Sequence, residues 1–207
     1  MGLKITMFSD FVCPFCYIGF EVMRKLKPEF NIELEWRGYQ IHPEWPAEGI
    51  SVEKVRSQTD LDARHAAWQR IKAMAEAEGL EIKAPSVFTS SRAALAACEF
   101  AREKGSAEEL EGRIYRAYFV EGANIGDAAL VARLSAECGF DENEVAEAIR
   151  SPRYDMKLKN NALAAHQRGV SGVPTFFIGE YPLVGAQSSD VMRQILQRAT
   201  ERVIATA

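Results

Sequence analysis

Residues 3–16 have the sequence LKITMFSDFVCPFC, and this stretch decides how the rest of the chain can fold. Residues 3–8 alternate apolar and polar side chains with the period of two that a half-buried strand requires, and residues 9–12 form a short connection. Proline is favoured at the first position of a helix, because its missing N–H group would have no partner there. Pro14 therefore predicts that a helix begins directly after Cys13, with Cys13 at its N-cap.

The N-cap position favours a nucleophilic role for Cys13. The backbone N–H groups of Phe15 and Cys16 are expected to point toward its sulfur, above the positive end of the helix dipole, so the thiolate gains more than the thiol. Cysteines in such positions carry a substantial thiolate fraction at neutral pH. Cys16 follows one helical turn later on the same face, within reach of a disulfide with Cys13. We expect Cys13 to attack a substrate and Cys16 to resolve the product.

Composition narrows the class of protein. The chain has 207 residues, 47% of them hydrophobic, so it can bury a core without disulfide bonds. Its formal charge of −4 and lack of a basic run argue against nucleic acid and membrane partners. We find no targeting segment and no stretch long enough to span a membrane, so a cytoplasmic protein is expected. In a reducing compartment, a Cys-x-x-Cys pair is more often redox-active or metal-binding than structural.

The remaining sequence predicts a βαβ unit, a helical block and a closing hairpin. Residues 32–38 alternate again, which predicts a second strand parallel to the first, and residues 40–59 are expected to form a long surface connection. Four or five amphipathic helices follow with no strand between them. A further helix, a hairpin and a final helix complete the chain. The predicted division is a core of residues 1–59 and 152–207, with a helical insertion subdomain at residues 60–151.

This order of elements, with Cys-x-x-Cys at the first strand-to-helix turn, is similar to the DsbA-like branch of the thioredoxin superfamily. Several stretches resemble the FrnE-type proteins of that branch more narrowly. They are Ser9-Asp10 before the cysteine motif, Ser91-Arg92-Ala93-Ala94, Tyr118-Phe119 before Asn124-Ile125, Gly172-Val173-Pro174-Thr175-Phe176 and Gly185-Ala186-Gln187. The resemblance covers essentially the whole chain. It implies an α/β thioredoxin fold, a mixed sheet flanked by helices, with a large all-helical insertion.

The resemblance also implies an activity and a set of site residues. It implies thiol-disulfide exchange with protein or small-molecule substrates, catalysed by Cys13 and Cys16, with Pro14 and Phe15 as the motif residues between them. In this superfamily the proline that matches Pro174 is cis and faces the disulfide, and the residue that matches Val173 pairs with bound substrate. No metal or organic cofactor is expected, although glutathione is a candidate co-substrate. The oligomeric state stays open.

One departure from the DsbA type concerns Phe15. In DsbA the dipeptide between the cysteines is Pro-His, and the histidine helps to stabilise the thiolate, whereas Phe15 offers no charge and no comparable donor. A less stabilised thiolate favours the disulfide over the dithiol. We therefore expect a less oxidising protein than DsbA, acting as a reductase or isomerase.

Three alternatives compete with this interpretation. The first is an enzyme class with a similar architecture: glutathione transferases of the kappa type and 2-hydroxychromene-2-carboxylate isomerases. These enzymes activate the thiol of glutathione with a serine or a single catalytic group near this turn. A structural zinc site is disfavoured because Cys98 and Cys138 are forty residues apart on separate helices and the histidines are scattered. A second redox pair of Cys98 and Cys138 is disfavoured because each lies on an apolar helical face. His42, beside Trp45 in the long connection, is more simply a packed residue.

Overall fold

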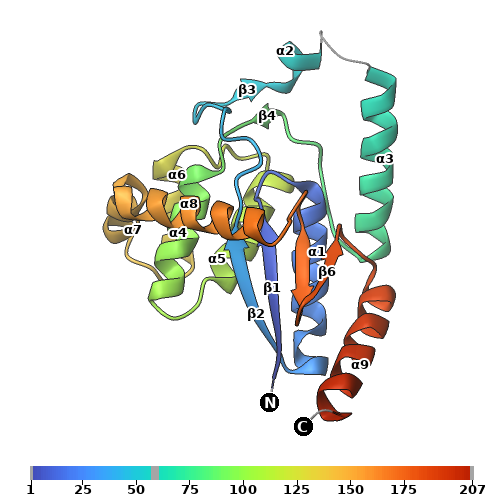
Figure 1. The fold of residues 1–207 in the computed structure, drawn as a ribbon. Helices are drawn as coiled ribbons and strands as arrows, with labels where there is room; N and C mark the ends of the chain where they lie inside the picture. Colours follow the sequence, from blue (N-terminus) through green and yellow to red (C-terminus); the bar gives the residue numbers. More distant parts are fainter. Residues whose placement is uncertain (1, 57–60, 206–207) are drawn as a thin grey trace.

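The strand before the cysteine motif lies inside a four-stranded sheet. The computed structural model describes residues 2–56 and 61–205 (Figure 1). The sheet has the order β2-β1-β5-β6 and is formed by β1 (Leu3–Ser9), β2 (Ile32–Gly38), β5 (Thr175–Ile178) and β6 (Tyr181–Val184). β1 pairs in parallel with β2 and antiparallel with β5, and β5 and β6 form a hairpin. The predicted βαβ unit and the predicted hairpin are therefore confirmed.

Helices make up most of the remaining described chain. Their bounds are α1 (Pro14–Phe30), α2 (Val52–Arg56), α3 (Leu61–Ala77), α4 (Arg92–Glu103), α5 (Glu108–Phe119), α6 (Ala128–Glu137), α7 (Glu142–Arg150), α8 (Pro152–Gln167) and α9 (Ser189–Ala205). Several begin at polar caps: the carboxylates of Asp127 and Asp141 accept backbone N–H groups at the starts of α6 and α7. Ser151 does the same for α8, where Pro152 takes the first helical position. Within the described residues, no helix is both long and apolar enough to cross a membrane.

The alternation of β1 places its side chains on two faces of the sheet. Ile5 and Met7 are fully buried in the larger hydrophobic core, which includes α1 and residues of α4–α7. Phe8 points to the opposite face, where it meets Phe177 of β5 and Ala165 of α8. In Figure 1, α8 crosses in front of the sheet and α1 lies behind it. Both faces of the sheet are therefore covered. The cysteine motif, which follows the carboxyl end of β1, lies in packed surroundings.

A small second sheet was not expected from the sequence. Within the predicted surface connection, Ile50–Ser51 forms the short strand β3, which pairs antiparallel with β4 (Val87–Phe88). β4 lies inside the segment that was expected to contain only helices. Strands of two residues are too short to carry a readable period, so the alternation test could not detect them. The amide of Asn124 also donates to the carbonyl of Ala47, which ties the connection to the helical block.

Candidate active site

The structure confirms that Cys13 is the N-cap of α1. Its backbone is extended, with φ −93° and ψ 116°, and Pro14 occupies the first turn. The Cys16 N–H donates to the Cys13 carbonyl at 3.0 Å, which closes that turn. The expected hydrogen bonds from N–H groups to the Cys13 sulfur are wrong: no side chain caps this helix. A neutral thiol is a weak acceptor but can donate, and the Cys13 sulfur lies 3.5 Å from the carbonyl oxygen of Val173 instead.

The turn that receives the Cys13 thiol comes from the other end of the chain. The Val173–Pro174 peptide bond is cis, as the family resemblance implied. The Pro174 carbonyl accepts the Gly185 N–H at 2.8 Å, which fastens this turn to the end of β6. Gly19 allows α1 to approach it, since a Cβ atom there would lie 3.0 Å from Phe176 and 3.4 Å from Pro174. The two sequence motifs therefore meet at one place.

The two cysteines have different surroundings. Both are free thiols; Cys13 is 6% exposed, whereas Cys16 has no exposed surface. The Asp10 N–H points at the Cys16 sulfur from 3.5 Å. Burial raises the pKa of the Cys16 thiol well above its usual range, and the neighbouring Cys13 adds to the rise. Phe15, between them in the sequence, is 37% exposed.

Polar residues that the sequence analysis did not assign to the site surround Cys16. Ser9 and Asp10 are fully buried where β1 ends, and the Ser9 hydroxyl lies 2.6 Å from the Tyr115 hydroxyl of α5. The Asp10 carboxylate accepts the Ile41 N–H at 2.7 Å, and the Ser91 side chain and the backbone of Phe11 and Val12 also act to lower its pKa. Burial raises the pKa of Asp10 to about 6. Two adjacent polar residues ending an apolar strand were the available signal for Ser9 and Asp10, but nothing local indicated Tyr115.

The residues that were set aside as structural are packed. His42 stacks on Trp45 with ring centroids 3.8 Å apart, and Trp45 stacks on Phe88 of β4, as the packing interpretation expected. Cys98 is fully buried on α4, as expected. The expected place of Cys138 on a helical face is wrong: it lies at the C-cap of α6 and is partly exposed, although it packs against the core. Among the described residues, no three His, Cys, Asp or Glu side chains cluster in a way that could hold a metal ion.

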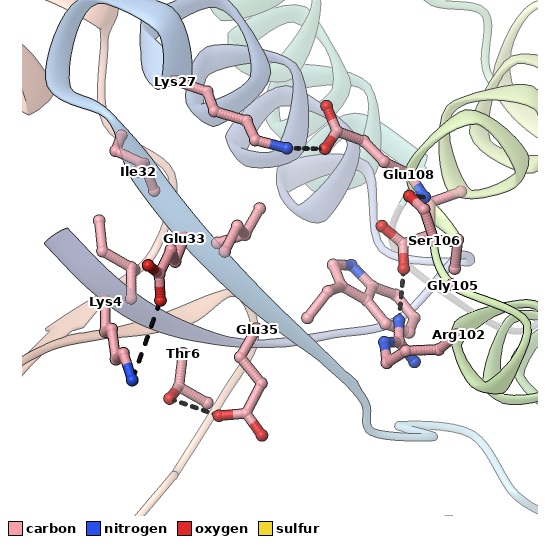
Figure 2. Close-up of a pocket in the computed structure, with 15 residues that line it drawn as sticks. Lys4, Thr6, Lys27, Ile32, Glu33, Glu35, Arg102, Gly105, Ser106 and Glu108 are labelled. Carbon is pink, nitrogen blue, oxygen red and sulfur yellow. Dashed lines mark hydrogen bonds and ion pairs between the residues drawn. The ribbon is translucent and has the colours of Figure 1, made fainter. Parts of the chain in front are cut away.

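A cavity of about 570 Å³ lies beside the first halves of β1 and β2 and is separate from the cysteines (Figure 2). Its lining includes Lys4, Lys27 and Arg102, but no residue of the cysteine motif. Each of these cations already faces a carboxylate, in the pairs Lys4–Glu33, Lys27–Glu108 and Arg102–Glu111. The fourth lining carboxylate, Glu35, pairs with Arg37. Every charged residue of the lining therefore has a partner, and we assign the cavity no role in the site.

Solved structures with the same architecture include proteins of redox and isomerase function. The probable DsbA oxidoreductase SCO1869 from Streptomyces coelicolor superposes with a TM-score of 0.86 and 25% identity, covering 96% of this chain and 90% of that one. The cytosolic disulfide reductase DsbM from Pseudomonas aeruginosa, solved with GSH, has a TM-score of 0.71 and 18% identity, over 96% and 100% of the two chains. A 2-hydroxychromene-2-carboxylate isomerase has a TM-score of 0.76 and 21% identity, over 99% and 97%. The similarities to DsbM and to the isomerase show a shared fold only.

Sequence comparisons place the chain in one family. The uncharacterized protein YwbO of Bacillus subtilis (strain 168) is 29% identical over 200 residues, which are 95% of this chain and 96% of that protein. The model of the DSBA-like thioredoxin domain matches residues 4–197, a span that contains the cysteine motif, the helical block and the cis-proline turn. This chain therefore belongs to the DSBA-like thioredoxin domain family.

Proposed function

We propose that this protein is a thiol-disulfide oxidoreductase in which Cys13 is the nucleophile and Cys16 the resolving cysteine. The observation that carries the proposal is the position of the Cys13 sulfur, at the start of α1 and 3.5 Å from the Val173 carbonyl of the cis-proline turn. Cys16 lies one helical turn inward and has no exposed surface. A substrate sulfur therefore reaches Cys13 first, and Cys16 meets only a sulfur that is already bound to Cys13.

The proposed cycle needs only the two cysteines and the substrate. The Cys13 thiolate attacks one sulfur of a substrate disulfide, and the other substrate sulfur leaves with the electron pair and takes a proton. Cys16 loses its proton and attacks the Cys13 sulfur, which forms the Cys13–Cys16 disulfide and releases the second substrate thiol. Two equivalents of an external thiol return the protein to the dithiol. Run in reverse, the same steps oxidise substrate thiols, and none requires a metal or an organic cofactor.

Val173, Pro174, Pro14 and Phe15 are the proposed substrate contacts. In the mixed disulfide, the substrate backbone would lie against the Val173-Pro174 turn, beside the half-exposed ring of Phe15. Phe15 brings no hydrogen-bond donor to the Cys13 sulfur, which supports a protein less oxidising than DsbA. Protein or small-molecule disulfides are the proposed substrates.

Glutathione is the proposed external thiol, and the cytoplasm the proposed compartment. Both are supported by the likeness to DsbM, a cytosolic disulfide reductase whose structure was solved with GSH. A glutathione-rich compartment would keep Cys13 and Cys16 reduced and would favour reduction or isomerisation of substrate disulfides.

The test is the reduction potential of the Cys13–Cys16 pair, measured by equilibration with reduced and oxidised glutathione. We expect a reversible two-electron couple in the unaltered protein and none in Cys13→Ser or Cys16→Ser. Cys16→Ser should accumulate a mixed disulfide at Cys13, whereas the control Cys138→Ser should keep the couple.

The opposite result would favour the other enzyme class that shares this fold. If no couple is found, and Cys16→Ser keeps full glutathione-dependent activity on a small electrophile or an isomerisable substrate, the oxidoreductase proposal is wrong. A transferase or isomerase of the kappa or 2-hydroxychromene-2-carboxylate type would then replace it.

A further inference from the structure

A chain of buried hydroxyl groups approaches Cys16 from α5. The Tyr115 hydroxyl lies 2.6 Å from the Ser9 hydroxyl and 3.4 Å from the Asp10 carbonyl, which it can donate to. Ser9 directly precedes Asp10, whose N–H points at the Cys16 sulfur from 3.5 Å, and the Ser9 side chain opposes the rise in the pKa of the Cys16 thiol. Tyr115, Ser9 and Cys16 are all fully buried. The hydroxyls therefore offer a donor to a sulfur that has no exposed surface for water to solvate.

Aromatic packing fixes the position of the Tyr115 hydroxyl. The Tyr115 ring has centroid distances of 4.8 Å to Phe11, 5.4 Å to Phe20 and 5.6 Å to Tyr17. Rings packed on several sides lose rotamer freedom during folding rather than during the reaction. A hydrogen bond from this phenol can thus form without reorganising the site, which is the condition under which buried donors stabilise a developing charge most.

When Cys16 is charged, the hydroxyl protons of Tyr115 and Ser9 can be donated in only one direction, toward the sulfur. Each hydroxyl carries one proton, so a Ser9 hydroxyl that donates to a Cys16 thiolate must accept from Tyr115. Burial raises the pKa of the Tyr115 phenol well above its usual range, so Tyr115 stays protonated and can donate. With Cys16 neutral, the phenol proton can turn to the Asp10 carbonyl instead. Rotation of the Tyr115 and Ser9 hydroxyls can therefore reverse the direction of their hydrogen bonds when the Cys16 sulfur gains or loses its charge.

We infer that Ser9 donates a hydrogen bond to the Cys16 thiolate during catalysis and that Tyr115 is the positioning residue that orients the Ser9 hydroxyl. The inference rests on the proposed thiol-disulfide exchange, because only that chemistry charges Cys16. Two steps do so. When an external thiolate attacks the Cys13 sulfur of the disulfide, the S–S bond breaks and its electron pair goes to Cys16. When Cys16 resolves a mixed disulfide, it must first lose its proton, and the departing substrate sulfur takes up one proton.

The decisive measurement is the resolution rate as a function of pH. Reduced protein is mixed with excess oxidised glutathione, quenched with acid, and analysed by mass spectrometry for conversion of the Cys13–glutathione adduct to the Cys13–Cys16 disulfide. The titratable groups around Cys16 are Cys13, Asp10 and Tyr115. The variants are Tyr115→Phe and Ser9→Ala. The control is Tyr118→Phe, which removes another buried α5 hydroxyl that donates to the Val87 carbonyl.

We expect Ser9→Ala to slow resolution at neutral pH roughly tenfold to hundredfold, as loss of one hydrogen bond to a charged group predicts. Tyr115→Phe should slow it roughly fivefold to tenfold, because Ser9 remains but is no longer oriented. Both should move the pH midpoint of resolution upward. The reduction potential at neutral pH should stay unchanged, because Cys16 is neutral in the resting dithiol.

Two different failures can be told apart. If Tyr115→Phe and Ser9→Ala match Tyr118→Phe in rate and pH midpoint, while Cys16→Ser still traps glutathione on Cys13, the inference is wrong and the proposed function stands. If no adduct forms on Cys13 in any variant, the proposed function fails and the inference fails with it. If a variant is less stable, the pH midpoint still decides, because lower stability alone does not change the proton affinity of Cys16.

Discussion

The sulfur of Cys13 lies 3.5 Å from the carbonyl oxygen of Val173, although 160 residues separate them in the chain. Cys13 ends the connection after β1, and Val173 precedes β5, the antiparallel neighbour of β1. The antiparallel pairing of these two strands thus brings both motifs to the same end of the sheet. At this end, Cys13 remains within reach of a substrate and Cys16 is covered.

Alkylation of the reduced protein should follow this difference between the cysteines. We expect iodoacetamide to modify Cys13 before Cys16, with Cys16 at least tenfold slower, because thiolates react and burial raises the pKa of the Cys16 thiol. Cys98, also fully buried with a raised pKa, should be slow as well, and the partly exposed Cys138 faster than Cys98. Peptide mapping at short times gives the order. Labelling of Cys16 before Cys13 would contradict the assigned roles.

The site was predictable from sequence where its signals were local. Pro14 marked the start of a helix, so the N-cap position of Cys13 followed from the residue type alone. The alternating residues of β1 and β2 predicted the two strands, and the helix between them predicted the parallel pairing that the structure confirms. The cis bond before Pro174 was expected only from the family resemblance, since most X–Pro bonds are trans.

The parts that could not be predicted depend on distant contacts. Tyr115 is 106 residues from Ser9, and its sequence neighbourhood is that of an ordinary amphipathic helix. The β3–β4 pair joins two-residue strands, whose stability comes from surrounding contacts such as the stacking of Trp45 on Phe88. The orientation of the Cys13 sulfur was wrongly expected because the cap argument considered only its own helix and not the carbonyl of Val173.

Asp10→Asn should make the free energy of unfolding less dependent on pH. The folded-state pKa of Asp10 is raised from 3.8 to about 6, so the folded protein holds this proton more tightly than the unfolded chain. Stability from this group is complete below about pH 4 and is lost as the pH rises through about 6, a loss of about 3 kcal/mol. Asparagine cannot ionise, yet its oxygen can still accept the Ile41 N–H.

Denaturant unfolding of both proteins between pH 4 and pH 8 measures this difference. Asp10→Asn should be more stable than the unaltered protein at pH 7 by roughly 2–3 kcal/mol and similar to it near pH 4. Asp127→Asn, at the exposed N-cap of α6, is the matched control and should change little, because asparagine also caps helices. Equal pH profiles for Asp10→Asn and the unaltered protein would show that Asp10 is not destabilised by burial.

Glu111→Gln should remove a second pH-dependent contribution, from a residue of α5 that is not among the causes of the Cys16 pKa shift. Burial raises the pKa of Glu111 from 4.5 to about 7, despite its ion pair with Arg102. The sign is the same as for Asp10: stability is lost as the pH rises from about 4.5 to about 7, by about 3 kcal/mol. Arg102 keeps Glu99 as a partner at 3.3 Å in the variant.

Thermal unfolding of Glu111→Gln at pH 5 and pH 8 checks this account. The variant should gain stability relative to the unaltered protein at pH 8 and show little difference at pH 5. Glu109→Gln, on the exposed side of the same helix, is the control. A variant that is less stable at pH 8 than at pH 5, relative to the unaltered protein, would mean that the Arg102 ion pair outweighs the burial of the carboxylate.

Phe15→His should make the protein more oxidising. The Phe15 side chain is 37% exposed, so a histidine there disturbs little packing and can place a donor beside the Cys13 sulfur. Stabilising the thiolate favours the dithiol form, and we expect the reduction potential to rise by about 30 mV or more. Phe15→Leu, which supplies no donor, should leave the potential unchanged. A potential that falls in Phe15→His would contradict the expectation that Phe15 sets a less oxidising couple than DsbA.

Gly19→Ala should weaken both stability and activity, because it separates α1 from the cis-proline turn. A Cβ atom at Gly19 would lie 3.0 Å from Phe176 and 3.4 Å from Pro174, both in well-packed surroundings, so the contact costs about 1–3 kcal/mol. Gly112 of α5 is the matched control, because a Cβ atom there would meet only Phe20 at an ordinary 3.5 Å. Gly112→Ala should therefore stabilise the protein by about 0.5–1 kcal/mol through helix propensity. Unfolding curves and the rate of glutathione exchange at Cys13 separate the two variants. If both alanines stabilise the protein and leave exchange unchanged, the approach of α1 to Pro174 does not position Cys13.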